Sequence, residues 1–458
     1  MRAYRAKMVE SIRLPDREER EAALDAAGHN VFNLDSDAVY VDLLTDSGTG
    51  TMSDAQWAAM MQGDEAYAGS GSFTDLEAAA SDVLGFDRIV PAHQGRGAEN
   101  VLYGSLVEPG DVVPNNTHFD TTRAHVVEQG GEPVDCPVEG ALDPGASGDF
   151  LGNFDVERAR AVVDEVGADR VPAVVVTLTN NSAAGQPVSV ANVRAVREFC
   201  DEIGATFVLD ACRFAENAHF VREREPEFAD STVAAVAREQ LSYADACIVS
   251  AKKDGLANVG GFVGIRDAPA FDDLFERAKQ RAILYEGFTT YGGMAGRDLA
   301  AVAVGLREAV TDAYITDRVE QVRWLGERLD EAGVPVVRPV GGHAVYVDAG
   351  AMCPHLRSEE FPGQAVVCDL YREGGVRGVE LGEFAFPGAD RPDLVRLAIP
   401  RRTYARDHLE HVVETAAAVA DHADDLPGYE VVSEPPMAEL RHFSADLRPL
   451  APSPGSEE

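Results

Sequence analysis

Lysine is the residue that this sequence most nearly lacks. Only four of its forty lysine and arginine residues are lysines, and two of these, Lys252 and Lys253, stand side by side after an apolar run of strand character, Ala246–Ser250. Arginine would supply positive charge equally well, but only lysine can lose its proton near neutral pH and form an imine with an aldehyde. The pair is therefore a candidate Schiff-base site. The alternative interpretation is a solvated basic pair at the end of a strand.

Other absences exclude whole classes of protein. No apolar run approaches the roughly 18 residues of a membrane span, and the first twenty residues hold no apolar core of a signal peptide. The formal net charge of −38 disfavours nucleic acid and anionic membrane as partners. The cysteines are far apart and form neither a CxxC pair nor a zinc spacing, namely Cys136, Cys200, Cys212, Cys247, Cys353 and Cys368. We expect a cytoplasmic globular protein that acts on a small molecule.

Acidic residues are in excess along the whole chain, which also prefers arginine to lysine and is rich in small residues. This composition is typical of adaptation to a high-salt cytoplasm. Salt near 1 M, with a Debye length of about 3 Å, would screen the self-repulsion of such a chain. We therefore predict that structure or activity is lost as salt is lowered.

Apolar strand-like runs alternate with helical patterns from residue 74 onward, which predicts a mostly parallel, doubly wound α/β sheet. We expect an N-terminal arm and part of a small domain at 1–50, a large domain at 51–304, a small α+β domain at 305–448 and a disordered tail at 449–458. Ser53 is predicted to cap one helix, and Thr74 with Glu77 to form the capping box of the next. The expected strands are Arg88–Val90, Asp111–Val113, Ala173–Thr177, Ala205–Leu209, Ala246–Ser250 and Gly261–Ile265, followed in the small domain by Val334–Val337, His343–Val347 and Val395–Ile399.

Ligands bind beyond the carboxyl ends of the strands in an open α/β sheet, and several of these ends carry suggestive residues. A glycine-rich turn at Gly95–Gly97, with Arg96, could cradle a phosphate. Asp210 directly follows the expected strand Ala205–Leu209, where it could cap a helix or pair with a cationic ring nitrogen. Lys252 and Lys253 follow the expected strand Ala246–Ser250. A phosphate cradle, an aspartate and a lysine in this order are the parts needed to hold pyridoxal phosphate.

At these residues the chain resembles the β-eliminating lyases of the fold-type I pyridoxal-phosphate enzymes, the family of tryptophanase and tyrosine phenol-lyase. The resemblance implies a seven-stranded, mostly parallel sheet in the large domain and a homotetramer with active sites at a dimer interface. The matching stretches run in order along nearly the whole chain: TDSGT (45–49), MMQGDEAYAGS (60–70), PAHQGRGAEN (91–100), HFDTTRAH (118–125), GQPVS (185–189), DACRFAENA (210–218), SAKKD (250–254), YEGFTTYGGMAGRD (285–298), GGHAVYVDA (341–349), VRLAIPRR (395–402) and LRHFSA (440–445).

The resemblance also implies roles for single residues. Lys253 would carry the imine and move the Cα proton, and Asp210 would pair with the pyridinium nitrogen. Arg396 would bind the substrate carboxylate, and Tyr67, from the same or a neighbouring subunit, would be a general acid. The remaining cofactor contacts would be Gln94, Gly95, Arg96, Ser250 and Lys252 at the phosphate, Phe119 stacked on the ring, and Asn181 and Arg213 near its oxygen. Thr45 and Ser47 would line the substrate pocket, and Gly48, Glu65 and Asn258 match a monovalent-cation site that favours potassium.

Three positions favour tryptophan over tyrosine as the substrate. By resemblance, Leu381 occupies the position at which the phenol-lyases have an arginine that stabilises the phenol oxygen. Leucine offers only an apolar wall there. Asp120 could accept the indole N–H, and His442 matches the tryptophanase pattern. We therefore expect elimination of indole from L-tryptophan. The alternatives are a tyrosine phenol-lyase, a broader lyase acting on cysteine or serine derivatives, and a pyridoxal-phosphate-binding protein without catalysis.

Overall fold

The large unit of the computed structural model is built on one seven-stranded sheet. The structure describes residues 2–389, 391–436 and 438–451. The strand order is β2-β8-β7-β6-β5-β3-β4, and β8 alone runs opposite to the other six strands. The strands are β2 (Arg88–Ala92), β3 (Val112–Asn115), β4 (Glu132–Asp135), β5 (Ala173–Thr177), β6 (Thr206–Asp210), β7 (Ala246–Ser250) and β8 (Gly261–Ile265). The predicted seven-stranded, mostly parallel sheet is confirmed.

Both faces of this sheet are buried, because successive side chains of a strand point to opposite sides. In β5, Val174 and Val176 belong to one apolar core, and Ala173 and Val175 to the other. The first core is formed with α3 (Gly71–Leu84), α6 (Val156–Val166), α7 (Val190–Ile203), α8 (Phe214–Arg224), α9 (Val233–Ser242) and α11 (Gly296–Ala309). The second is formed with α4 (Gly95–Leu106), α5 (Asp120–Glu128) and α10 (Asp272–Tyr285).

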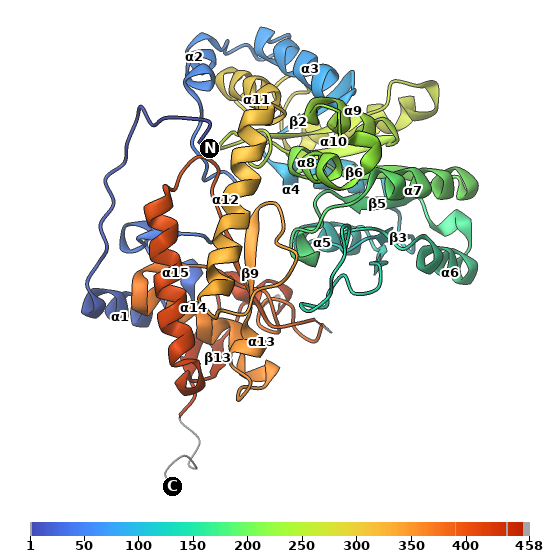
Figure 1. The fold of residues 1–458 in the computed structure, drawn as a ribbon. Helices are drawn as coiled ribbons and strands as arrows, with labels where there is room; N and C mark the ends of the chain where they lie inside the picture. The colour runs from blue at the N-terminus through green and yellow to red at the C-terminus, as the bar shows by residue number, and fades with distance from the viewer. Residues whose placement is uncertain (1, 390, 437, 452–458) are drawn as a thin grey trace.

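The second unit combines the C-terminal part of the chain with its N-terminal segment, and α12 (Asp312–Glu331) leads into it (Figure 1). β1 (Val41–Asp42) pairs with β10 (Val376–Arg377), so residues from both ends of the chain share one apolar core. The remaining strands are β9 (Ala344–Asp348), β11 (Val379–Glu380) and β12 (Leu394–Ala398), which form an antiparallel sheet, and the hairpin β13 (Tyr429–Ser433) with β14 (Asp446–Pro449). The helices are α1 (Arg17–Ala26), α13 (Ala349–Met352), α14 (Pro362–Gly374) and α15 (Arg406–Asp421).

Several local predictions were wrong. The helix predicted to start at Thr74 begins at Gly71, because the hydroxyl of Ser70 accepts the Phe73 N–H and caps it three residues earlier. Val334–Val337 forms no strand beyond a bridge between Val336 and Val347, since Pro335 lacks the N–H that a ladder needs. The predicted list also lacked β4, an edge strand that tolerates Pro133, and α8.

Other local predictions were confirmed. Ser53 caps α2 (Asp54–Gln62) in a capping box with Gln56. By contrast, the predicted disordered tail was wrong at its first residues, because β14 extends to Pro449 and the Leu450 N–H donates to the Gly428 carbonyl. Residues 452–458 of the predicted tail lie outside the described part. Within the described ranges, no helix combines the length and apolar character needed to cross a bilayer.

Candidate active site

The predicted cofactor residues gather where β2, β5, β6 and β7 end, on loops that face the second unit. Gln94 and Gly95 open α4 after β2, Asn181 follows β5, Asp210 ends β6, and Lys253 follows β7. Parallel strands place these ends at one edge of the sheet. The structure therefore brings together residues that lie 160 positions apart.

The candidate phosphate cradle is formed where the backbone at Gly95 packs closely against Ser250. An added Cβ on Gly95 would lie 2.8 Å from the Cβ of Ser250, and one on Gly261 would lie 2.8 Å from the carbonyl carbon of Gln94. Glycine is therefore needed at both positions. The first turn of α4 starts here, and its free N–H groups favour an anion.

Four cations at this edge have no carboxylate partner. Among the described residues, no salt bridge joins Arg96, Lys252, Lys253 or Arg396 to an acidic side chain, although the chain has 78 acidic residues. Burial first, and then the charges of Arg96 and Lys253, lowers the pKa of Lys252. Unpaired cations held close together in so acidic a chain indicate a site for anionic ligands.

Lys253 lies in a turn in which its backbone N–H donates to the Ser250 carbonyl. Its side-chain amine lies 6.0 Å from the centroid of the Phe119 ring. Phe119 caps α5, so the next residue, Asp120, opens that helix. Burial raises the pKa of Asp120, while Arg96, Arg396 and Lys253 oppose this shift. The lysine, the stacking ring and the predicted indole acceptor are thus neighbours.

Asp210 does not cap α8, so that alternative is excluded. Its carboxylate accepts the N–H of Cys212, whereas the N–H groups of Ala215 and Glu216 in the first turn of α8 donate to Asp254. Asp210 is left at the floor of the site with an exposed fraction of 8%. This placement is compatible with the predicted pairing to a ring nitrogen.

Sequence reasoning missed Glu99, which lies one turn into α4. Its carboxylate accepts the hydroxyls of Thr121 and Thr122 at 2.7 and 2.5 Å, which ties α4 to the start of α5. Burial raises the pKa of Glu99 to about 7. A glutamate in a helical pattern reads as a surface residue, so nothing in the sequence signals this role.

Sequence reasoning also missed a buried ionic network beneath the site. Arg213, predicted near the ring oxygen, forms a bidentate pair with Asp46 at 2.8 and 3.0 Å. Arg401, from the second unit, contacts Asp46, Glu216 and Asp254 at 2.8–2.9 Å. Although burial opposes ionisation, the two arginines hold the pKa of Asp46 well below its usual range. The network connects both units directly behind Lys253.

Two of the predicted substrate-binding segments meet, because Arg396 contacts the residue before Thr45. Arg396 on β12 donates to the Leu44 carbonyl at 3.2 Å and lies 3.5 Å from the Asn181 carboxamide oxygen, and its Nε is buried without a described partner. The Thr45 hydroxyl accepts the N–H of Ser47 at 3.1 Å in the adjoining loop. A guanidinium with an unused buried N–H is suited to a carboxylate ligand.

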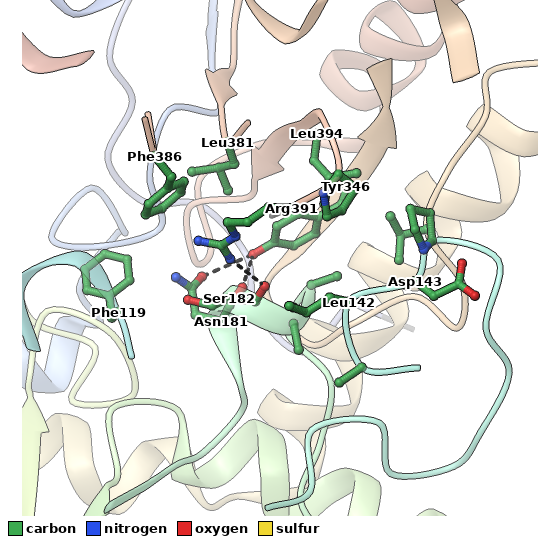
Figure 2. Close-up of a pocket in the computed structure, with 16 residues that line it drawn as sticks. Phe119, Leu142, Asp143, Asn181, Ser182, Tyr346, Leu381, Phe386, Arg391 and Leu394 are labelled. Atoms are coloured by element: carbon green, nitrogen blue, oxygen red, sulfur yellow. Dashed lines mark hydrogen bonds between the residues drawn. The ribbon is translucent and has the colours of Figure 1, made fainter. Parts of the chain in front are cut away.

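The cleft between the two units continues into a pocket that residues of both units line (Figure 2). Leu381 forms an apolar part of its wall together with Phe119, Phe386 and Leu394. Arg391, which sequence reasoning missed, also reaches into it: its guanidinium stacks 4.1 Å from the Phe386 ring and donates to the Ser182 carbonyl at 3.1 Å. The wall at Leu381 is therefore apolar, but the guanidinium of Arg391 places a positive charge elsewhere in the pocket lining.

Two predicted site residues remain apart from this cluster in the single chain. Tyr67 is 70% exposed and packs on Phe288 and Tyr291. Glu65 forms an exposed pair with Arg297 at 2.7 Å. The other two predicted cation ligands do meet, because the Asn258 amide donates to the Gly48 carbonyl and the Gly48 N–H donates to the Lys252 carbonyl.

His442 is buried against Phe443, with 3.8 Å between the ring centroids. Burial, and then the charges of Arg396, Arg96 and Arg441, lowers the pKa of His442 to about 4. The imidazole is therefore neutral near pH 7, at the rim of the cluster of unpaired cations.

This pKa predicts a loss of stability in mild acid. Because the folded-state pKa lies below the unfolded value near 6.5, the contribution of His442 is present above that pH and is lost as the pH falls toward about 4. Urea unfolding between about pH 7 and about pH 5 should show a loss of about 1–3 kcal/mol that the His442→Gln variant does not share. Equal pH dependence in both proteins would contradict the assignment.

Comparisons with known proteins find relatives that align with almost the whole chain. A relative from Halobacterium salinarum, named "Probable tryptophanase", is 66% identical over 98% of this chain and 100% of its own length. A "Tryptophanase" from Salinibacter ruber is 48% identical over 98% of this chain and 95% of the relative, and a "Tyrosine phenol-lyase" from Pasteurella multocida is 46% identical over 98% of each.

The fold also occurs in a distant solved structure. A chain in the crystal structure of the SepCysS–SepCysE N-terminal domain complex superposes with a TM-score of 0.56 at 13% identity, covering 84% of this chain and 95% of that one. It shows the fold alone. The family model described as "Beta-eliminating lyase" matches residues 42–415. With this match, and with relatives aligned over almost its full length, the chain belongs to the β-eliminating lyase family.

Proposed function

We propose that this enzyme cleaves L-tryptophan with water to indole, pyruvate and ammonia. The observation that carries the proposal is the cluster of unpaired cations around Lys253, whose charges act on the carboxyl of Asp120. A bound amino acid there has its carboxylate near Arg396 and its ring near an acceptor for an indole N–H. The 66% identity to a probable tryptophanase supports the same substrate.

The family implies pyridoxal phosphate, and the residues present fit this group. Gly95, Arg96, Ser250 and Lys252 would hold its phosphate, Phe119 would face its ring, and Asp210 would meet its nitrogen. When bound, the cofactor supplies an aldehyde for lysine and a ring that takes up negative charge from Cα of the substrate.

Different side chains of this protein then bind the substrate, move its protons and exclude water. Arg396 orients the amino acid by its carboxylate, and Lys253 removes the proton from Cα. Asp120 accepts the indole N–H while the ring carbon is protonated, with Tyr67 as the proposed acid. Leu381 and Phe386 exclude water from the ring pocket.

The test is release of indole and pyruvate from L-tryptophan by the purified protein in concentrated potassium chloride with added pyridoxal phosphate. L-tyrosine and S-alkyl-cysteine are assayed in parallel. Indole equimolar with pyruvate supports the proposal. Phenol from tyrosine at a comparable rate would instead indicate a phenol-lyase that uses Arg391, and pyruvate from cysteine derivatives alone would indicate a different β-elimination.

The exposed position of Tyr67 supports a homotetramer in which it serves a neighbouring site. Ile283, Leu284 and Tyr285 at the end of α10 are 50%, 78% and 60% exposed, so large apolar side chains are available for a subunit interface. A potassium ion held by Gly48, Asn258 and Glu65 would likewise need a second subunit to bring Glu65 near.

Mixing inactive Tyr67→Phe and Lys253→Ala proteins should restore activity, because hybrid assemblies contain intact sites. No recovery on mixing would place Tyr67 outside the neighbour's site.

We further infer that the enzyme works in a high-salt cytoplasm. The acidic side chains that give the net charge of −38 repel one another, and lowering the salt concentration lengthens the range of that repulsion. We expect the midpoint of thermal unfolding and the activity to fall together as salt is reduced from about 3 M to about 0.1 M. Sodium chloride with a little potassium, at constant ionic strength, separates this effect from a specific potassium requirement. Full stability at low ionic strength would contradict the inference.

A further inference from the structure

The carboxamide of Asn181 is held by an unusual number of donors. Its Oδ1 lies 2.9 Å from Nε2 of His343, 3.1 Å from the hydroxyl of Tyr346 and 3.5 Å from Nη1 of Arg396. The Tyr346 hydroxyl also lies 3.0 Å from the backbone carbonyl of Asn181, as Figure 2 shows for the Asn181–Tyr346 pair. All three partners come from β9, β12 or the loop before β9, whereas Asn181 belongs to the large unit.

These contacts fix which end of the amide faces the cleft. A guanidinium only donates, so the atom that faces Arg396 must be the oxygen. The Nδ2 group therefore points the other way. Among the described residues it has no acceptor, and it is not sealed in the protein, since Asn181 lines the pocket. Two N–H bonds are thus presented to a ligand.

The tautomer of His343 follows from its surroundings. The side chain is fully buried, and its Nδ1 has no described partner and faces Gly185, where an added Cβ would lie 2.8 Å away. Burial, and then the charge of Arg213, lowers the pKa of His343, so the ring is neutral. Its single proton is best placed on Nε2, where it is donated to the Asn181 oxygen.

We propose that His343 and Tyr346 are positioning residues that lock the Asn181 amide with its N–H groups toward an anionic oxygen bound in the cleft. The oxygen belongs either to the ring of pyridoxal phosphate or to the substrate carboxylate on Arg396, since both are acceptors of the same kind. The proposal rests on the proposed function for the presence of these two groups.

The consequence is a specific pattern of coupling. Tyr346 and His343 also contact each other at 3.3 Å, but in this proposal they reach the ligand through the Asn181 carboxamide. Removing them should therefore have little further effect on either readout once the carboxamide is gone. Two residues that only stabilise the fold would affect the Asn181→Ala protein as much as the natural one. The locking contacts also cross between the two units, so they form only when the cleft is assembled.

The test compares Tyr346→Phe, His343→Ala and Asn181→Ala, and each double variant with Asn181→Ala, in proteins loaded with pyridoxal phosphate. The first readout is the pH titration of the visible absorbance of the bound cofactor without substrate. The second is the dissociation constant of L-alanine, which presents a carboxylate but no leaving group. Tyr371→Phe is the matched control, because its buried hydroxyl donates to the Ala38 carbonyl far from the cleft.

We expect Tyr346→Phe and His343→Ala to change the same readout as Asn181→Ala, by about three- to tenfold in the acid or ligand dissociation constant. A change in the cofactor titration identifies the ring oxygen as the acceptor, and a change in L-alanine binding identifies the carboxylate. The double variants should resemble Asn181→Ala alone, and His343→Gln, which can still donate, should restore the natural value.

Several results would overturn the inference. One is that both readouts stay unchanged in Tyr346→Phe while Asn181→Ala alters either of them. Another is that Tyr346→Phe has its full effect in the Asn181→Ala protein, or that Tyr371→Phe has an equal effect. A natural protein with no cofactor absorbance would instead refute the proposed function, so the two failures are distinguishable. If His343→Ala does not fold, Tyr346→Phe and His343→Gln still decide the outcome.

Discussion

Replacement of Lys253 by alanine is expected to lower the rate of elimination by at least about a thousandfold, because the variant lacks the group that we propose moves the Cα proton. Lys253→Arg should be equally inactive, since arginine keeps the charge but cannot lose its proton near neutral pH. Lys252→Arg is the matched control. It preserves the charge beside the Gly95 cradle and should keep most of the activity.

A chemical label makes this prediction independent of the activity assay. Borohydride treatment of the natural protein with bound pyridoxal phosphate should attach the pyridoxyl group to Lys253, as mapped by peptide mass spectrometry. Lys253 faces the Phe119 ring at 6.0 Å, whereas Lys252 contributes its charge beside Arg96. A label on Lys252, or a Lys253→Ala protein with near-natural activity, would exchange the roles of the two lysines.

Replacement of Arg401 by methionine should have the largest effect on stability. The guanidinium is 2% exposed and is shared by Asp46, Glu216 and Asp254. Its loss leaves the buried Asp254 without a described cationic partner, whereas Asp46 and Glu216 each keep one other arginine. Breaking a buried ion pair on one side costs about 3–5 kcal/mol. We expect a loss of this size in the free energy of unfolding in urea.

The matched control for Arg401 is Arg323→Met. Arg323 also contacts both oxygens of a glutamate, Glu223, at 2.7 and 2.9 Å, but this pair is largely exposed and should contribute at most about 1 kcal/mol. Similar losses in the two variants would mean that the buried network carries no special share of the stability. If Arg401→Met is stable but inactive, the network positions Lys253 through Asp254 without stabilising the fold.

The sequence determined the main sheet and the central lysine. β5 and β7 are short apolar runs, and alternation of such runs with helical patterns leaves few ways to build a sheet. The near absence of lysine made Lys253 recognisable, because a residue that a chain otherwise avoids is conspicuous. Collinear motifs predicted the remaining cofactor contacts, which stay predictions, and the match to the β-eliminating lyases over 42–415 confirmed the family.

Only the tertiary structure decided which charged groups are paired and which are free. Arg213 and Arg401 form buried ion pairs, while Arg396 and Lys253 have no carboxylate partner among the described residues. Nothing in their local sequences distinguishes the paired cations from the unpaired ones. Likewise, Glu99, His343 and Arg391 carry no local signal, since their roles arise from contacts between segments far apart in the chain. Hydrophobic periodicity is a local property that a sequence displays, whereas the pairing of charges depends on which distant segments meet at the cleft.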